Sequence, residues 1–124
     1  MSNLMEDEVR VLVVDDDADI ALVFASFLSQ DGYMVRVAPD GQGALAMAES
    51  FAPHCVLLDV NMPGINGAEL SRRFRALYGD DVVLIAITGS SSVDANVRET
   101  FDRVDHYLQK PFDLAALRKV LPPL

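Results

Sequence analysis

The chain has 124 residues, of which 51% are hydrophobic and 23% charged, a composition that fits one globular domain with its own core. Its net charge of −9 at pH 7 argues against nonspecific binding to nucleic acids or anionic membranes, because both need a basic surface. The acidic excess lies in one half: residues 1–62 hold eleven acidic and two basic residues, whereas residues 63–124 hold eight of each. Such an excess is either a cation site or a solvated face, and composition does not choose between them.

The sequence also argues against disulfide-rich, zinc-binding and membrane classes. Cys55 is the only cysteine, so no internal disulfide or cysteine-based zinc cluster can form, and its apolar neighbours predict a buried thiol. No apolar run approaches the roughly 18 residues that span a bilayer. Residues 1–8 lack the pattern of a secretory signal. We therefore expect a soluble, cytoplasmic protein.

Short apolar runs alternate with longer segments of helical spacing along the chain. Four of the five runs are almost continuously apolar, which is typical of strands covered on both faces. In chain order, the predicted strands are Val9–Val14, Tyr33–Val37, Cys55–Leu58, Val82–Ile87 and Asp105–Gln109.

The segments between the strands carry helix signals. Asp17 is predicted to cap the first helix, Asp40 with Gly41 opens the second, and Asp113 precedes a short fifth helix. A fourth helix is predicted to begin at Ser92 or Asp94. Apolar residues at helical spacing mark the first helix (Ile20, Val23, Phe24, Phe27 and Leu28), the third (Leu70, Phe74 and Leu77) and the fifth (Leu114, Leu117 and Leu121).

Five strands, each followed by a helix, predict an α/β fold with a parallel sheet and helices on both faces. The chain is predicted to be one doubly wound domain over residues 9–121. Residues 1–8 would be an N-terminal tail, and residues 122–124 a C-terminal tail or the start of a linker. In such a sheet, ligands bind beyond the carboxyl ends of the strands.

Polar residues follow four of the five predicted strands. Asp15 and Asp16 follow the first strand, Asp59 the third, Thr88 the fourth and Lys110 the fifth. Three carboxylates brought together repel one another, and a hard divalent cation such as Mg²⁺ relieves the repulsion. A carboxylate nucleophile, a metal, a lysine and a hydroxyl are the groups that phosphoryl transfer needs. The chain has no glycine-rich phosphate loop, which disfavours nucleotide binding by that route.

Four segments resemble the receiver domains of two-component response regulators. They are Val11–Asp17 (VLVVDDD), Val56–Gly67 (VLLDVNMPGING), Ala86–Gly89 (AITG) and Tyr107–Phe112 (YLQKPF). The resemblance covers roughly residues 9–121. It implies a flavodoxin-like fold, with a five-stranded parallel sheet in the order 2-1-3-4-5 and five helices.

The resemblance also implies a metal-dependent phosphoacceptor. Asp59 would accept a phosphoryl group from a histidine of a partner, either a histidine kinase or a histidine phosphotransfer protein. Asp16, Asp59 and the backbone carbonyl of Asn61 would bind Mg²⁺ directly, and Asp15 mostly through water.

Further residues match the family's phosphoryl-binding and switch positions. Thr88 and Lys110 would contact the phosphoryl oxygens, and the Lys110–Pro111 peptide bond would be cis. Tyr107 would turn inward as Thr88 moves toward the phosphoryl group. The surface of the fourth helix, fifth strand and fifth helix would then select a downstream output protein or domain, and this face allows dimerisation.

On this interpretation the chain is a phosphorylation-controlled switch rather than an enzyme, although it takes part in its own phosphorylation and dephosphorylation. Two alternatives remain: a pseudo-receiver that binds partners without phosphorylation, and an aspartyl-phosphate phosphatase. The phosphatase needs a second aspartate two residues after the nucleophile, where this chain has Asn61. The chain also departs from the family at Arg103, where a glycine often ends the fourth helix. His54 and His106 are predicted to be structural or surface residues.

Overall fold

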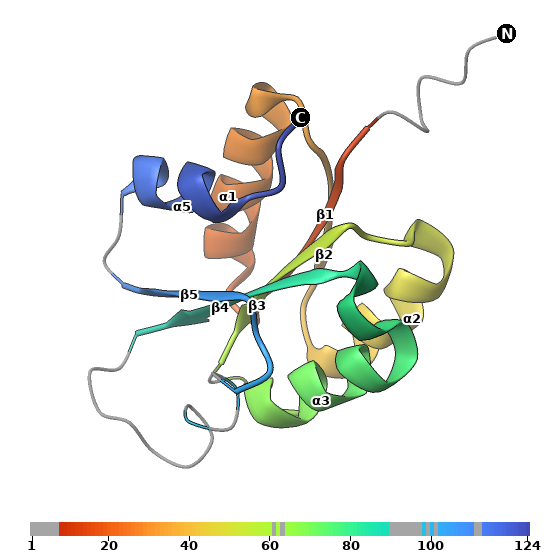
Figure 1. Cartoon of the computed structure of the whole chain (residues 1–124). Coiled ribbons are helices and arrows are strands. Elements are labelled where there is room, and N and C mark those ends of the chain that lie inside the picture. Colours follow the sequence, from red (N-terminus) through yellow and green to blue (C-terminus); the bar gives the residue numbers. More distant parts are fainter. Residues whose placement is uncertain are drawn as a thin grey trace, which may run out of the picture.

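The computed structural model in Figure 1 describes residues 8–60, 62, 64–89, 98, 100, 102–110 and 113–124. The strands are β1 (Arg10–Val14), β2 (Met34–Ala38), β3 (Cys55–Asp59), β4 (Val83–Thr88) and β5 (His106–Gln109). The helices are α1 (Ala18–Asp31), α2 (Gly41–Phe51), α3 (Gly67–Tyr78) and α5 (Leu114–Val120), and a short 3-10 helix covers Gly79–Asp81. The predicted fourth helix falls in a segment of which only residues 98 and 100 are described.

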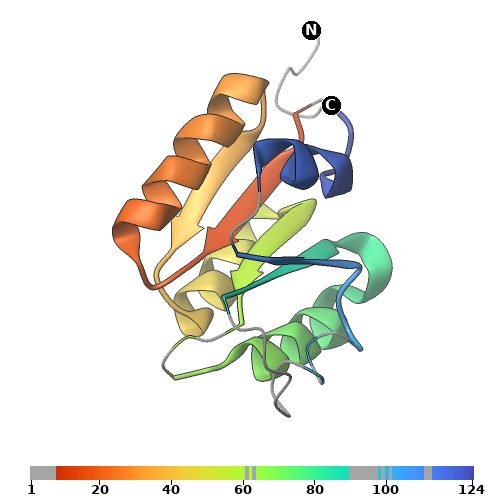
Figure 2. The same ribbon diagram turned by 90° about the vertical axis from the view of Figure 1, so that its left-hand side faces the viewer.

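The five strands form one parallel sheet in the order β2-β1-β3-β4-β5, as predicted. Figures 1 and 2 show α1 and α5 on one face of this sheet and α2 and α3 on the other. The fold is therefore the doubly wound α/β architecture, with four α-helices in the part of the chain that the structure describes. Within that part, every helix is too short or too polar to cross a lipid bilayer.

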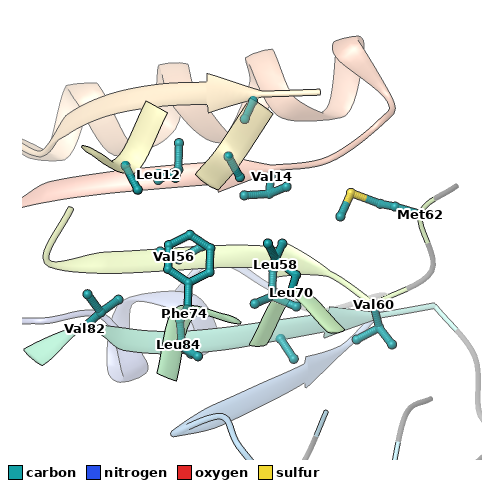
Figure 3. Packing of buried hydrophobic residues seen from close by; sticks show 14 of the residues in the cluster. Leu12, Val14, Val56, Leu58, Val60, Met62, Leu70, Phe74, Val82 and Leu84 are labelled. Carbon is teal, nitrogen blue, oxygen red and sulfur yellow. The ribbon is translucent and has the colours of Figure 1, made fainter. Parts of the chain in front are cut away.

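The sheet separates two hydrophobic cores, because successive strand residues point to opposite faces. On β1, Leu12 and Val14 pack with α2 and α3, whereas Val11 and Val13 pack with α1 and α5. Figure 3 shows the first of these cores, in which α3 contributes the buried Phe74. The predicted burial of Cys55 is confirmed, and its side chain lies in the second core.

The predicted starts of α1, α2 and α5 are confirmed by side-chain capping. The Asp17 carboxylate accepts hydrogen bonds from the backbone N–H groups of Asp19 and Ile20, at 3.0 and 3.2 Å. Asp40 and Asp113 cap α2 and α5 in the same way. These bonds satisfy backbone donors that the first turn of a helix leaves free.

Three residues of the predicted apolar helix faces lie outside the core. Val23 of α1 is 67% exposed, Leu77 of α3 is 63% exposed and Leu114 of α5 is 42% exposed. The buried stripe of α1 instead runs through Ala21 and Leu28, with Phe24 and Phe27 partly buried. The spacing therefore predicted the helices correctly, but the buried faces that it predicted are wider than those in the structure.

Candidate functional site

The strand order places the polar residues at one edge of the sheet. β1 and β3 are neighbours whose last paired residues are Val14 and Leu58, so Asp15 and Asp59 emerge side by side. β4 lies on the other side of β3 and ends at Thr88. β5 follows β4, and Lys110 comes directly after it.

Three carboxylates meet at this edge. Asp15, Asp16 and Asp59 each offer a carboxylate oxygen, and these oxygens lie within 4.8 Å of one another. Asp15 is buried, Asp59 half-buried and Asp16 exposed, so the cluster opens to solvent on the Asp16 side. Oxygen donors at this spacing fit a hard divalent cation, which neutralises their mutual repulsion. The structure thus assembles an acidic cluster that could hold a metal ion.

The backbone around Asp15 fixes its position. Its Oδ1 atom accepts a hydrogen bond from the Asp17 N–H at 2.9 Å, and its own N–H donates to the Ala38 carbonyl at 3.2 Å. The first bond links the cluster to the N-terminus of α1, which Asp17 caps. One carboxylate of the cluster is therefore held in place by local backbone structure.

The loop after Asp59 is held by a close helix contact. The Val60 N–H donates to the Ile87 carbonyl at 3.0 Å, and the Gly67 N–H donates to the Val60 carbonyl at 3.0 Å. A Cβ atom at Gly67 would lie only 2.8 Å from the Val60 Cα, so only glycine allows this approach. Gly67 ends the Val56–Gly67 motif, but this contact was not predicted from the sequence. Its position at the start of α3 was the available signal.

Thr88 and Lys110 lie at the carboxyl ends of the next two strands: Thr88 ends β4, and Lys110 directly follows β5. The Thr88 side chain is buried, and Lys110 is half-buried. The Lys110 N–H donates to the Thr88 carbonyl at 2.7 Å, which fixes the backbone of both residues at the end of β4. A hydroxyl and an ammonium group therefore belong to the same sheet edge as the three carboxylates.

Comparison with known proteins agrees with this geometry. Residues 11–122 match the response regulator receiver domain family. The chain belongs to this family. It is 41% identical over 109 residues to the response regulator MprA of Mycolicibacterium vanbaalenii, covering 88% of this chain and 47% of the relative. MprA of Mycobacterium tuberculosis strain H37Rv gives the same identity and coverage. The receiver domain thus spans about half the length of the curated relatives it matches.

Solved structures show the same fold. The chemotaxis protein CheY4 of Vibrio cholerae superposes with a TM-score of 0.80 at 30% identity, covering 92% of this chain and 99% of that one. A CheY-like receiver domain protein from Methanospirillum hungatei gives a TM-score of 0.83 at 28% identity, covering 90% and 89% of the two chains. Both confirm the predicted receiver fold.

Two predicted site residues, Asn61 and Pro111, lie outside the described residues. Tyr107 lies on β5 and is 56% exposed, so in this structure its ring points toward solvent. His54 is half-buried, and its Nδ1 accepts a hydrogen bond from the Arg10 N–H at 2.9 Å. Burial, and then the nearby Arg10, lower the pKa of His54. The structural role predicted for this histidine is confirmed.

Proposed function

We propose that this receiver domain is a phosphoacceptor whose Asp59 takes a phosphoryl group from a phosphohistidine of a histidine kinase or histidine phosphotransfer protein. The observation that carries the proposal is the cluster of Asp15, Asp16 and Asp59, whose carboxylate oxygens lie within 4.8 Å of one another. Thr88 at the end of β4 and Lys110 directly after β5 would supply the hydroxyl and the ammonium group.

Asp16, Asp59 and the Asn61 carbonyl would bind Mg²⁺ directly, and Asp15 would hold it mostly through water. When bound, the ion would neutralise the negative charge of the carboxylates and of the incoming phosphoryl group. Membership of the receiver family and the oxygen-only donor set support this choice of metal.

The chemical step uses a carboxylate oxygen of Asp59 as the nucleophile. This oxygen bonds to phosphorus as the phosphorus–nitrogen bond of the donor histidine breaks, and the bonding electron pair returns to the imidazole. The product is an acyl phosphate on Asp59. The Lys110 ammonium group and the Thr88 hydroxyl would bind the phosphoryl oxygens. They would stabilise the negative charge on these oxygens and take no covalent part in the transfer.

The acyl phosphate would act as a switch. It adds negative charge and acceptor oxygens at the carboxyl edge of the sheet, and these favour a state in which Thr88 approaches the phosphoryl group and Tyr107 turns inward. The surface that includes β5 and α5 would then bind a downstream output protein or domain, or a second copy of the chain. The greater length of the MprA relatives supports an output domain.

The domain's role is therefore regulatory, and it takes part in its own phosphorylation and dephosphorylation without turning over a separate substrate. It would act in the cytoplasm beside its kinase and would not itself contact nucleic acid. The net charge of −9 supports the last point.

Incubation with acetyl phosphate tests the proposal. With Mg²⁺ present, intact-mass spectrometry should show one phosphoryl adduct on the wild-type chain, and EDTA should prevent it. Asp59→Asn should abolish the adduct. Asp17→Asn is the matched control, because it removes a neighbouring charge outside the cluster and keeps a capping side chain. A wild-type chain that stays unmodified under conditions that phosphorylate another receiver domain would refute the proposal and favour a pseudo-receiver.

A further inference from the structure

A single arginine joins α3 to the segment that leads into β5. The Arg75 guanidinium lies near the C-terminus of α3, and its side chain is 20% exposed. Its Nε donates to the Arg103 carbonyl at 2.8 Å, and its Nη1 donates to the carbonyls of Gly79 and Val82 at 2.9 and 2.8 Å. Its Nη2 donates to Oδ2 of Asp105 at 2.8 Å. One side chain therefore binds four acceptors from three parts of the fold.

Asp105 extends this linkage to β4. Its Oδ2 also accepts a hydrogen bond from the Leu84 N–H at 2.8 Å, and its own N–H donates to the Leu84 carbonyl at 2.9 Å. Burial raises the pKa of Asp105, but the bonds from Leu84 and Arg75 outweigh it, so the pKa is lowered overall. The carboxylate is thus charged at neutral pH and tied to both β4 and α3.

The same arginine also binds the backbone at Arg103, where this chain departs from the family. Among the described residues, Ala52 is the only non-glycine residue with a positive φ, so Arg103 does not adopt a left-handed cap. The N–H groups of Arg103 and Val104 both donate to the Thr100 carbonyl, at 3.0 and 3.2 Å. The Arg103 carbonyl accepts its hydrogen bond from Arg75 instead. Basic side chains serve in this way at the ends of helices.

We call Arg75, together with its acceptors at Arg103 and Asp105, the clamp. The clamp lies next to the strand that carries the switch residue Tyr107. β5 begins at His106, one residue after Asp105, and pairs only with β4 among the described strands. It carries Tyr107 and leads to Lys110. Asp59 and Thr88 lie at the opposite, carboxyl ends of their strands. The clamp therefore fixes where β5 starts without touching the phosphoryl site.

We propose that Arg75 is a positioning residue of the phosphorylation switch, which anchors the start of β5 so that charge added at Asp59 moves Tyr107. This inference rests on the proposed function. An edge strand with a free start would let its first residues fray, and Tyr107 would then exchange between inward and outward positions with or without a phosphoryl group. Arg75 would thus determine how strongly the two ends of the sheet are coupled.

The test separates phosphorylation from its consequence. Wild type and Arg75→Gln are treated with acetyl phosphate and Mg²⁺, the adduct is measured by intact mass, and the Tyr107 ring is followed by NMR. We expect equal phosphorylation of the two chains. The phosphorylation-induced change in the inward–outward equilibrium of Tyr107 should fall about threefold or more in the variant, within the range usual for residues that couple two sites. Arg75→Lys, which keeps the charge without the planar fork, should restore part of the response.

Two controls exclude a general loss of stability. Arg73→Gln removes a neighbouring arginine whose partner is Glu69 of the same helix. Val11→Ala weakens the core on β1, away from the clamp. Both should keep the full Tyr107 response. Should Arg75→Gln fail to fold, Asp105→Asn gives the second test, because it keeps the acceptor for Leu84 and removes the ion pair.

The outcomes are distinguishable. If the wild-type chain is not phosphorylated, the proposed function fails and the inference falls with it. If wild type responds and Arg75→Gln responds equally, the inference alone is refuted. A reduced response in Val11→Ala as large as that in Arg75→Gln would also refute it, since the effect would then follow stability.

Discussion

Replacement of Asp59 by asparagine should stabilise the metal-free protein, although it removes the proposed phosphoacceptor. The fold holds the Asp59 carboxylate oxygen within 4.8 Å of those of Asp15 and Asp16. Asparagine has nearly the same shape and no charge, so the variant loses two repulsive pairs while the loop can keep its conformation. Stability without metal would therefore favour asparagine at this position, whereas the proposed function requires aspartate.

The size of the effect follows from the spacing. Two unit charges 4.8 Å apart repel by about 0.9 kcal/mol at the dielectric constant of water and by about 3.5 kcal/mol at an effective value of 20. Asp16 is exposed and Asp59 only half-buried, so solvent and salt bring the Asp16–Asp59 pair to the lower figure, whereas the pair with the buried Asp15 is screened mainly on the Asp59 side. We expect a net gain of about 1–2 kcal/mol, which would raise the urea midpoint by about 0.5–1 M for a domain of this size.

Urea unfolding followed by circular dichroism, in EDTA and in excess Mg²⁺, measures the stability of each chain without and with the metal ion. Without metal, Asp59→Asn should unfold at higher urea than wild type. With Mg²⁺ the difference should shrink or reverse, because a ligand at about 100 times its Kd stabilises the form that binds it by about 2.7 kcal/mol. Asp17→Asn should follow wild type in both buffers. Lower stability of Asp59→Asn in EDTA, or equal stabilisation of both chains by Mg²⁺, would refute the reasoning.

Three further predictions concern the fold. Asp17→Ala should lower the free energy of unfolding by about 1 kcal/mol through loss of the α1 cap, and Asp17→Ser should restore most of it; an unchanged urea midpoint in Asp17→Ala would contradict the capping role. Phe74→Ala should cost about 3–5 kcal/mol in calorimetry, because its ring is 1% exposed in the core, and a loss under 1 kcal/mol would contradict that burial. Burial raises the pKa of Cys55 to about 12, so the thiol should react with a disulfide reagent only as fast as the chain unfolds, and faster labelling would show that it is accessible. Because its folded pKa is raised, its stabilising contribution is complete below the thiol's ordinary pKa and is lost as the pH rises toward about 12.

Local patterns predicted the elements well because their causes are local. The start of α2 follows from Asp40, and the burial of β3 follows from a run of apolar residues around Cys55. Spacing could not show that Val23 and Leu77 are exposed, because the width of a buried stripe depends on what packs against the helix. The strand order has no local cause either, and its prediction came from the family resemblance.

The site, too, has residues that could be predicted from the sequence and contacts that could not. The pairing of β1 with β3 brings together Asp15 and Asp59, which the strand-end rule had already selected from the sequence. The clamp was beyond prediction, since Arg75 and Asp105 are 30 positions apart and nothing local marks them as partners. The close approach of Gly67 to Val60 likewise depends on how α3 packs. Strand ends are thus predictable from sequence, whereas side-chain links between elements need the fold.

The fold accounts for part of the acidic excess, because three of the eleven acidic residues of the first half form the cluster. The two basic residues of the first half lie away from the cluster: Arg10 donates to the Ala52 carbonyl, and Arg36 lies over the Phe51 ring. The fold therefore brings three carboxylates together without using either of these bases to neutralise them. A solvated face would spread its charges apart, and stability alone would favour the loss of one carboxylate. For these three acids, convergence at the carboxyl edge of the sheet, which also carries the buried Thr88, supports a cation site rather than a solvated face.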